Sequence, residues 1–287
     1  MFDGLHRGHA KIVTTLLRDA SRYQVSSMVV TFDPHPMKIL APKKYHPTIL
    51  MSLEHKLKTL ECMGVQEVCV IRFNASIASM DRKEFLEKIL LGKFGAVSIT
   101  AGHDFRFGKN ALGDGAFLSD QSERGKRYRL YRVSALKHNN EAISSTRIRG
   151  LVETGDLVLA KKLLGRPVSV VGTVVHGRGR GKRVGFPTAN LNPHHEALPP
   201  EGVYAAYGYL GRKKLKGVIH IGQRPTFGDK VKSLEVHFLN FHKNIYGRAI
   251  ELVFVKRLRE IQKFSSAEQL HKAIQNDIRC AETILKG

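Results

Sequence analysis

The hydrophobic pattern of this chain changes at Gly165-Arg166-Pro167, and this change constrains the fold more than any other feature. Before it, strand-like and helix-like segments alternate, which is typical of a parallel sheet covered by helices on both faces. After it, strand-like segments follow one another between Gly, Pro, Asn and Lys turns, an order typical of an antiparallel barrel. A length of 287 residues is enough for two domains. We therefore predict an α/β domain over residues 1–165 and a β-barrel domain over residues 166–287.

The predicted elements follow from hydrophobic periodicity and from the turn residues that separate the segments. In the first domain we expect a helix after His9, strands over residues 25–32, 67–71, 96–100 and 129–133, and helices over residues 52–63, 81–93 and 155–165. In the second domain we expect strands over residues 168–175, 202–210, 215–222, 233–241 and 249–258, and a final helix over about residues 265–285. Ser52 is the predicted N-cap of the helix that follows it, and Ser265 or Ser266 is that of the last helix.

The first nine residues, MFDGLHRGH, lead directly into the first predicted helix. His6 and His9 therefore stand at a helix N-terminus, where N–H groups and the helix dipole favour an anion. Two imidazoles beside a phosphate can donate hydrogen bonds to oxygens that gain charge in a transition state. The alternatives are a histidine that only caps the helix and a histidine pair that binds a metal.

Two loops follow predicted strands of the first domain, where ligands of α/β sheets bind. The loop DPHP contains Asp33 and His35 between prolines, which support neither a strand ladder nor a helix interior. The loop GHDFRFG contains Phe105 and Phe107 between glycines. These two rings would line an aromatic ligand or would fill the core.

The segment ISSTRIR over residues 143–149 begins a predicted helix. Hydroxyl groups such as those of Ser145 and Thr146 cap a helix start whatever else they do. Arg147 and Arg149 oppose the helix dipole, a local cost that an anion would offset. This arrangement favours contact with a triphosphate over capping alone.

The segment GRGRGKRVGFPTAN over residues 177–190 combines glycines, basic residues and a Pro-Thr-Ala-Asn turn. Backbone N–H groups approach a phosphate closely where no Cβ intervenes, which favours an ATP-phosphate cradle at Gly177, Gly179 and Gly181. Thr188 and Asn190 offer oxygen ligands of the kind that Mg²⁺ takes. The segment lacks the spacing of a Walker loop. A basic surface hairpin with flexible glycines is the alternative.

Glu235 alternates with apolar residues in the predicted strand that contains it. A carboxylate in such a position points to solvent or lines the mouth of the barrel. The spacing of the residues does not decide between these two positions.

The formal charge of +22 is spread over the chain, with +10 in residues 1–165 and +12 in residues 166–287. Such a field attracts nucleic acid, and it attracts small polyphosphate substrates equally. No zinc finger, RNP-type aromatic signature or repeat accompanies the charge, so nucleic acid is not the expected partner. The sequence shows no secretory signal and no apolar run long enough for a bilayer, so no membrane partner is expected. The cysteines Cys62, Cys69 and Cys280 form no paired motif, which favours reduced, mostly buried thiols and a cytoplasmic location.

Five motifs occur in an order that resembles bacterial bifunctional FAD synthetase, in which riboflavin kinase is joined to FMN adenylyltransferase. They are FDGLHRGH, TFDPHP, GHDFRFG, ISSTRIR and GFPTAN, and RPTFG and LEVHFLNF complete the second half. The resemblance covers essentially the whole chain. It implies a Rossmann-like nucleotidyltransferase domain, followed by a six-stranded antiparallel β-barrel riboflavin kinase domain with a C-terminal helix.

The resemblance also implies roles for the residues of these motifs. His6 and His9 match the motif that stabilises the α-phosphate of ATP. The remaining matches are Ser145, Thr146 and Arg149 with the ATP phosphates, Asp33 and His35 with the nucleotide site, Phe105 and Phe107 with the flavin, Thr188 and Asn190 with Mg²⁺–ATP, and Glu235 with the general base. The implied reactions are ATP-dependent phosphorylation of riboflavin to FMN and adenylylation of FMN to FAD with release of pyrophosphate.

Three departures from the family pattern affect these expectations. The family usually has a complete strand ahead of the Phe-Asp-Gly turn, whereas Met1 stands directly before Phe2. We therefore expect weak adenylyltransferase and near-normal kinase activity. His103 stands where the family more often has a carboxylate, and Asn240 stands where it commonly has Asp. Two rival interpretations are a kinase with a defective first module and a regulator that binds flavin or nucleic acid. The sequence leaves the oligomeric state open.

Overall fold

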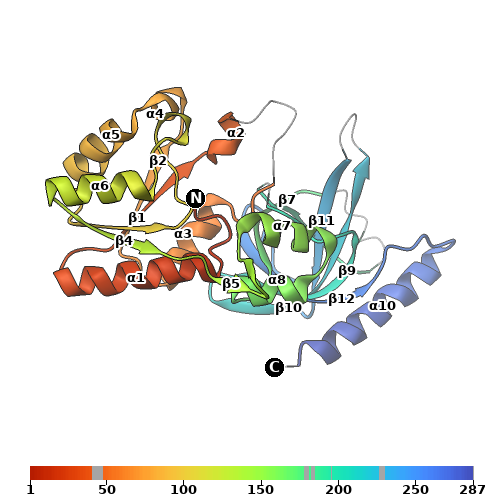
Figure 1. Ribbon diagram of the computed structural model, residues 1–287. Helices are drawn as coiled ribbons and strands as arrows, with labels where there is room; N and C mark the ends of the chain where they lie inside the picture. Colours follow the sequence, from red (N-terminus) through yellow and green to blue (C-terminus); the bar gives the residue numbers. More distant parts are fainter. Residues whose placement is uncertain (41–47, 178–180, 182–184, 195, 226–229, 287) are drawn as a thin grey trace. The chain divides into compact units, whose positions relative to one another are not determined.

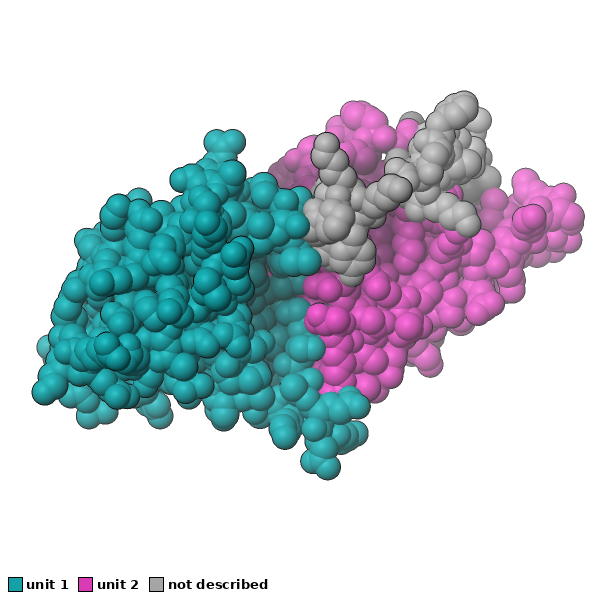
Figure 2. Space-filling view, turned by 45° about the horizontal axis from the view of Figure 1, so that its top comes forward, with its two compact units in different colours: residues 1–47, 56–145 teal, residues 48–55, 146–287 magenta. Residues whose placement is uncertain are grey.

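The computed structural model describes residues 1–40, 48–177, 181, 185–194, 196–225 and 230–286 (Figure 1). The chain divides into two compact units that Figure 2 shows in different colours. Unit 1 comprises Met1–Pro47 and Lys56–Ser145, and unit 2 comprises Thr48–His55 and Thr146–Gly287. The segment Thr48–His55 therefore belongs to unit 2, although unit 1 precedes and follows it in the sequence.

The helices of unit 1 begin where the sequence supplies capping side chains. The side chain of His6 caps the first helix, Asp81 caps the fifth, and Asp114 caps the sixth. The helical elements, in chain order, are α1 (Arg7–Tyr23), α2 (Pro36–Leu40), α3 (Leu53–Cys62), α4 (Ala75–Ser79), α5 (Arg82–Glu84), the π-helix η1 (Phe85–Lys93), the 3₁₀ turn η2 (Lys109–Ala111) and α6 (Gly115–Gly125). Helix α3 starts in unit 2 and continues in unit 1, because the division falls between His55 and Lys56.

The strands of unit 1 form two separate parallel pairs. Strand β1 (Met28–Asp33) pairs with β2 (Glu67–Arg72), and β3 (Ser98–Gly102) pairs with β4 (Arg129–Val133). Among the residues that the structure describes, no strand joins the two pairs. The parallel direction agrees with the α/β fold that the sequence predicts, but the predicted continuous sheet is present as two halves.

The core beside the second pair of strands is built from one hydrophobic cluster. Its buried members are Phe85, Leu86, Leu90, Ala101, Phe107, Leu118 and Tyr128. The Tyr128 hydroxyl donates a hydrogen bond to the carbonyl oxygen of Leu118, 2.6 Å away, so the ring is buried with its polar atom satisfied. This cluster fixes η1 and α6 against the strands.

Unit 2 is built on a closed six-stranded antiparallel barrel with the order β10-β11-β8-β7-β12-β9. The strands are β7 (Ser169–Val175), β8 (Ala189–Asn192), β9 (Gly202–Leu210), β10 (Lys213–Pro225), β11 (Lys230–Phe238) and β12 (Ala249–Arg259). Helix α10 (Ala267–Ile284) covers part of the barrel, where Ala281 and Leu285 pack against Val203 and Ala205. Closure leaves the barrel without an open sheet edge. This arrangement confirms the predicted barrel and its C-terminal helix.

Two helices precede the barrel in the sequence, α7 (Ser145–Thr154) and α8 (Leu157–Leu164). All of α8 and all but the first residue of α7 group with unit 2. The hairpin of β5 (Lys137–His138) and β6 (Glu141–Ala142) precedes them in unit 1. The division of the chain by compactness thus falls twenty residues before the boundary that we predict from the sequence pattern.

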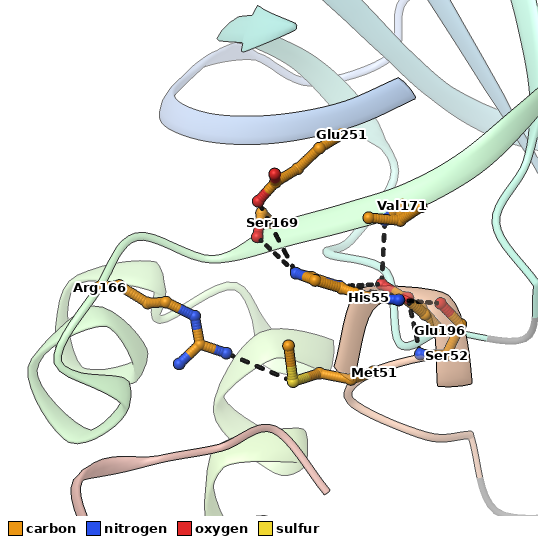
Figure 3. Close-up of polar contacts among 8 residues, drawn as sticks. All are labelled: Met51, Ser52, His55, Arg166, Ser169, Val171, Glu196 and Glu251. Carbon is orange, nitrogen blue, oxygen red and sulfur yellow. Dashed lines mark hydrogen bonds and ion pairs between the residues drawn. The ribbon is translucent and has the colours of Figure 1, made fainter. Parts of the chain in front are cut away.

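A buried carboxylate, Glu196, holds the segment Thr48–His55 to the barrel (Figure 3). Its oxygens accept hydrogen bonds from the backbone N–H of Ser52 (2.7 Å) and of Val171 (3.1 Å), and His55 Nδ1 lies 3.2 Å from Oε2. On the other side of its ring, His55 Nε2 lies 3.3 Å from Ser169 Oγ and 3.7 Å from Glu251 Oε1. A buried carboxylate is stable only when its oxygens are satisfied in this way.

Most predicted elements are present with ends shifted by a few residues. Ser52 Oγ accepts the N–H of His55, which confirms Ser52 as the cap of α3, and Ser266 caps α10. The prediction of mostly buried thiols is wrong, because Cys62 and Cys280 are exposed and Cys69 is half-buried, although all three are free. In the described part of the chain, no helix has the length and apolar character needed to cross a membrane.

Candidate active sites

His6 and His9 lie together at the start of α1. Their rings stack with centroids 3.8 Å apart and 17° between the planes, and Phe2 packs against His9 at 5.2 Å. The backbone N–H of His9 donates to Nδ1 of His6 over 3.3 Å. Because Nδ1 of His6 accepts this bond, the neutral ring carries its proton on Nε2, which is then a donor.

The stacked pair keeps His9 uncharged. Burial is the main cause that lowers the pKa of His9 to about 2, and the neighbouring His6, amino terminus and Lys56 contribute to the same shift. Nδ1 of His9 is buried without a hydrogen-bond partner in the part of the chain that the structure describes. A buried polar atom without a partner is costly, so this nitrogen is suited to meet a ligand.

A cavity of about 720 Å³ opens beside the two histidines and runs between β1 and β3. Val29 and Val30 line it from one strand, Ile99 and Thr100 line it from the other, and α1 contributes Ile12 and Val13. The cavity therefore occupies the gap between the two halves of the sheet. It joins the histidine pair to a mainly apolar space.

The two strand-end loops have different surroundings. Asp33 is exposed at the end of β1, and Nδ1 of His35 accepts the backbone N–H of Met37 over 3.2 Å. Phe105 lines the cavity, whereas Phe107 is buried in the hydrophobic cluster and stacks on Phe105 at 5.3 Å. Of the two positions that the sequence allows for these rings, Phe105 takes the one beside the cavity and Phe107 takes the one in the core.

The ISSTRIR segment forms the start of α7, as its hydroxyl residues predict. Ser145 Oγ donates to the carbonyl oxygen of Asp3 over 2.8 Å, so Ser145 joins this helix start to the loop that carries His6. Ser145 also lines the cavity. Thr146 and Arg149 follow in unit 2, because the division of the chain falls after Ser145.

In the barrel, Thr188, Asn190 and Glu235 come together on β8 and β11. Asn190 lies directly opposite Glu235 in the antiparallel pairing, and Thr188 lies two residues before Asn190. Directly opposed residues and residues two apart share one face of a sheet. The hydroxyl of Thr188 donates to Oε2 of Glu235 over 3.2 Å. Glu235 is half-buried and belongs to this cluster, so it does not simply face the solvent.

Two glycines ahead of this cluster allow the chain to approach it closely. The side chain of Asn190 occupies the space that a Cβ on Gly177 would need. A Cβ on Gly181 would meet the carbonyl oxygen of Phe186, and the backbone N–H of Phe186 donates to the Gly181 carbonyl over 2.9 Å. Gly179 and the four basic residues of this segment lie outside the described residues. A side chain at position 177 or 181 would therefore displace the candidate ligands.

The donor set of this cluster fits a hard divalent ion such as Mg²⁺. A hydroxyl, an amide oxygen and a carboxylate are oxygen ligands of the kind that Mg²⁺ takes, and phosphate oxygens supply the rest when a nucleotide binds. The described residues contain no group of three or more His, Cys, Asp or Glu side chains arranged to hold a metal. An ion at this cluster would accordingly need the phosphates as ligands.

Sequence reasoning missed Lys56, a buried lysine in unit 1. The signal was its place among Leu53, Leu57 and Leu60, which makes it a charged residue on the apolar face of a helix. It also missed Glu196, which no motif contains.

Two family models match the chain, FAD synthetase over residues 1–147 and riboflavin kinase over residues 164–285. The bifunctional riboflavin kinase/FMN adenylyltransferase of Bacillus subtilis is 35% identical over 280 residues, covering 96% of this chain and 88% of that protein. The protein of the same description from Haemophilus influenzae is 34% identical over 288 residues, covering 100% of this chain and 92% of that one.

The chain belongs to the bifunctional riboflavin kinase/FMN adenylyltransferase family.

A solved structure from Streptococcus pneumoniae, described as a macrolide-efflux protein, superposes with a TM-score of 0.84 at 29% identity. The superposition covers 98% of this chain and 91% of that one, so the two structures share their fold over nearly their full length. The FAD synthetase match contains the His6–His9 pair, and the riboflavin kinase match contains the Thr188–Asn190–Glu235 cluster. Family membership thus confirms the resemblance that the motifs indicate.

Proposed function

We propose that this chain phosphorylates riboflavin to FMN in unit 2 and adenylylates FMN to FAD in unit 1, using ATP in both steps. The observation that carries the proposal is the cluster of Thr188, Asn190 and Glu235, which combines oxygen ligands with a carboxylate in a riboflavin kinase match. The high positive charge suits these substrates, because ATP, FMN and pyrophosphate are all anions.

In the kinase step, Glu235 accepts the proton of the ribityl 5′-hydroxyl group as that oxygen attacks the γ-phosphorus of ATP, and ADP leaves with the bridging oxygen. Phosphoryl transfer depends on positioning and on charge neutralisation more than on a protein nucleophile. Thr188 and Asn190 would hold Mg²⁺, which neutralises charge on the phosphates when bound. Thr188 also orients Glu235 through the hydrogen bond between their side chains. Gly177 and Gly181 admit the nucleotide phosphates, with Gly179 proposed as part of the same cradle.

In the adenylyl step, an oxygen of the FMN phosphate attacks the α-phosphate of ATP and pyrophosphate leaves. We propose this direct attack, with no covalent enzyme intermediate. His6, with its proton on Nε2, donates a hydrogen bond to an oxygen that gains charge in the transition state. We assign ATP contacts to His9, Ser145, Thr146, Arg149, Asp33 and His35, and flavin contacts to Phe105 and Phe107.

Product analysis with riboflavin, ATP and Mg²⁺ tests the proposal. Formation of FMN followed by FAD is the expected result, and chromatography with fluorescence detection separates the two products. FMN alone would restrict the chain to the kinase step. The absence of both products would overturn the proposed function.

The proposed location is the cytoplasm, since the three cysteines are free and reduced thiols persist there. The proposed partners are the small-molecule substrates alone. Gel filtration would give the oligomeric state. A filter-binding assay at physiological salt would test the proposal that nucleic acid is not a partner.

A further inference from the structure

The face of the barrel that carries Glu235 continues onto β10, where His220 lies directly opposite Glu235 in the antiparallel pairing. On its other side, Glu235 lies opposite Asn190 of β8, so the three residues form one row across three neighbouring strands. Directly opposed residues share a face of the sheet and have Cβ atoms about 5 Å apart. Glu235 therefore stands between a proposed metal ligand on one strand and a histidine on the other.

The ring of His220 is open to a ligand. His220 is exposed, whereas its neighbour in the row on β9, Val203, is 3% exposed and packs against helix α10. The ring extends along its own strand toward Gly222, where an added Cβ would lie 2.8 Å from Cε1 of His220. Glycine at position 222 therefore leaves room for the ring on the open part of the face.

The two ring nitrogens of His220 are available for binding. In the described part of the chain, neither of them forms a hydrogen bond. A neutral imidazole offers one donor and one acceptor. A hydroxyl group likewise donates and accepts, so an alcohol is a suitable partner for this ring.

The order of the strands indicates which substrate reaches His220. In phosphoryl transfer, the attacking and the leaving oxygen lie roughly in line at the phosphorus. Thr188 and Asn190, which would hold Mg²⁺–ATP, precede β11 in the barrel order, and β10 follows it. The acceptor alcohol would thus meet Glu235 from the side of β10. The spacing of neighbouring strands is one that a few carbon atoms of the ribityl chain can span.

We propose that His220 hydrogen-bonds a hydroxyl group of the ribityl chain and so makes the kinase site specific for a flavin that carries this chain. The inference rests on the proposed phosphorylation of riboflavin in unit 2. His220 transfers no proton, because the proton of the 5′-hydroxyl group goes to Glu235 and ADP leaves with the bridging oxygen. A site that hydrogen-bonds a substrate hydroxyl group discriminates against an analogue without it.

The kinetic test uses the full chain with His220→Phe, which keeps a ring beside Gly222 and removes both nitrogens. His242→Phe is the matched control, because His242 is an exposed histidine of the same unit. We expect His220→Phe to raise the KM for riboflavin about tenfold, as the loss of one hydrogen bond does, and to leave the KM for ATP within twofold. His220→Asn should restore most of the loss, since an amide also donates and accepts.

A binding test identifies the part of the flavin that His220 contacts. Lumiflavin has a methyl group where riboflavin has the ribityl chain, and quenching of flavin fluorescence measures the affinity for both in the presence of Mg²⁺ and ADP. His220→Phe should weaken riboflavin binding about tenfold relative to His242→Phe and should leave lumiflavin binding unchanged. An equal loss for both flavins, or an unchanged affinity for riboflavin, would overturn the inference.

The outcomes also separate this inference from the proposed function. If the parent chain forms no FMN but its binding of riboflavin alone depends on His220, the contact stands and the proposed phosphorylation fails. If the parent chain binds no riboflavin, both fail. A lowered kcat with an unchanged affinity for riboflavin would show that His220 acts only through Glu235, and it would overturn the proposed contact.

Discussion

The hydroxyl of Thr188 donates a hydrogen bond to the carboxylate of Glu235 across two neighbouring barrel strands, with 3.2 Å between Oγ1 and Oε2. This bond joins a proposed metal ligand to the proposed general base. A substitution at either residue should therefore change the position of the other side chain. The effects of the two single substitutions on kinase activity are not expected to add up in the double variant.

Glu235→Gln should abolish FMN formation, with a loss of about 100-fold or more, because the amide cannot accept the hydroxyl proton of riboflavin. The amide oxygen can still accept the hydrogen bond of Thr188, so the fold of the barrel should be kept. Steady-state phosphorylation of riboflavin measures the loss, and Glu260→Gln is the control because Glu260 is 82% exposed. An unchanged turnover of Glu235→Gln would exclude Glu235 as the base.

Gly177→Ala should weaken the use of Mg²⁺–ATP, because the added Cβ would displace the side chain of Asn190. We expect the KM for ATP to rise about tenfold, in line with the loss of a supported metal ligand. Gly150→Ala is the matched control, since a Cβ there meets no atom within 4 Å. Titration of ATP and Mg²⁺ in the kinase assay distinguishes the two variants, and equal KM values would contradict the proposed role of Asn190.

Glu196→Gln should destabilise unit 2 by about 3 kcal/mol, because two backbone N–H groups and His55 lose a buried anionic acceptor. Urea unfolding of the full chain, followed by a probe in the barrel, measures this change. Glu153→Gln is the control, since Glu153 is exposed and accepts one hydrogen bond, from Thr48. We expect the control to change the free energy of unfolding by about 0.5 kcal/mol or less. Similar midpoints for the two variants would show that the Glu196 cluster contributes little.

The stability of unit 1 should fall as the pH falls below 6.5. The pKa of His9 is about 2 in the folded chain, so His9 binds a proton in the unfolded chain first. The contribution of neutral His9 is therefore complete above pH 6.5 and is lost progressively between pH 6.5 and pH 2. At pH 5.5 the loss should be about 1 kcal/mol. Urea unfolding at pH 7.5 and pH 5.5 measures it, and His9→Gln should remove that part of the pH dependence; an unchanged dependence would contradict the assignment to His9.

The sequence predicts the elements of the barrel well, because their signals are local. Residues such as Val203 and Ala205 sit in apolar runs bounded by turn residues, and those runs became strands of the closed barrel. Strand β8, in contrast, was not predicted. It is four residues long and begins with the last two residues of the GFPTAN motif, so its pattern is too short to show a period.

The sequence predicts that His6 and His9 lie together at a helix start, because they are three residues apart in one motif, and their rings stack there. Only the family resemblance groups Thr188 and Asn190 with Glu235, since Glu235 lies 47 residues from Thr188. Lys56 and Glu196 were not foreseen, because their partners are distant in the sequence. Thr31 lies 25 residues from Lys56, and Ser52 lies 144 residues from Glu196. Only the folded chain brings such groups together. The sequence also does not predict that Thr48–His55 belongs to unit 2, because the partners of this segment are distant in the sequence.

The place of Thr48–His55 in unit 2 has a consequence for dividing the chain. Glu196 accepts the backbone N–H of Ser52, so the barrel unit depends on a segment that lies far ahead of its other residues in the sequence. A fragment that starts at Thr146 would lack that donor and His55, and its buried carboxylate would be left with fewer partners. The two units are therefore interleaved in sequence, and no single cut between them yields unit 2 intact.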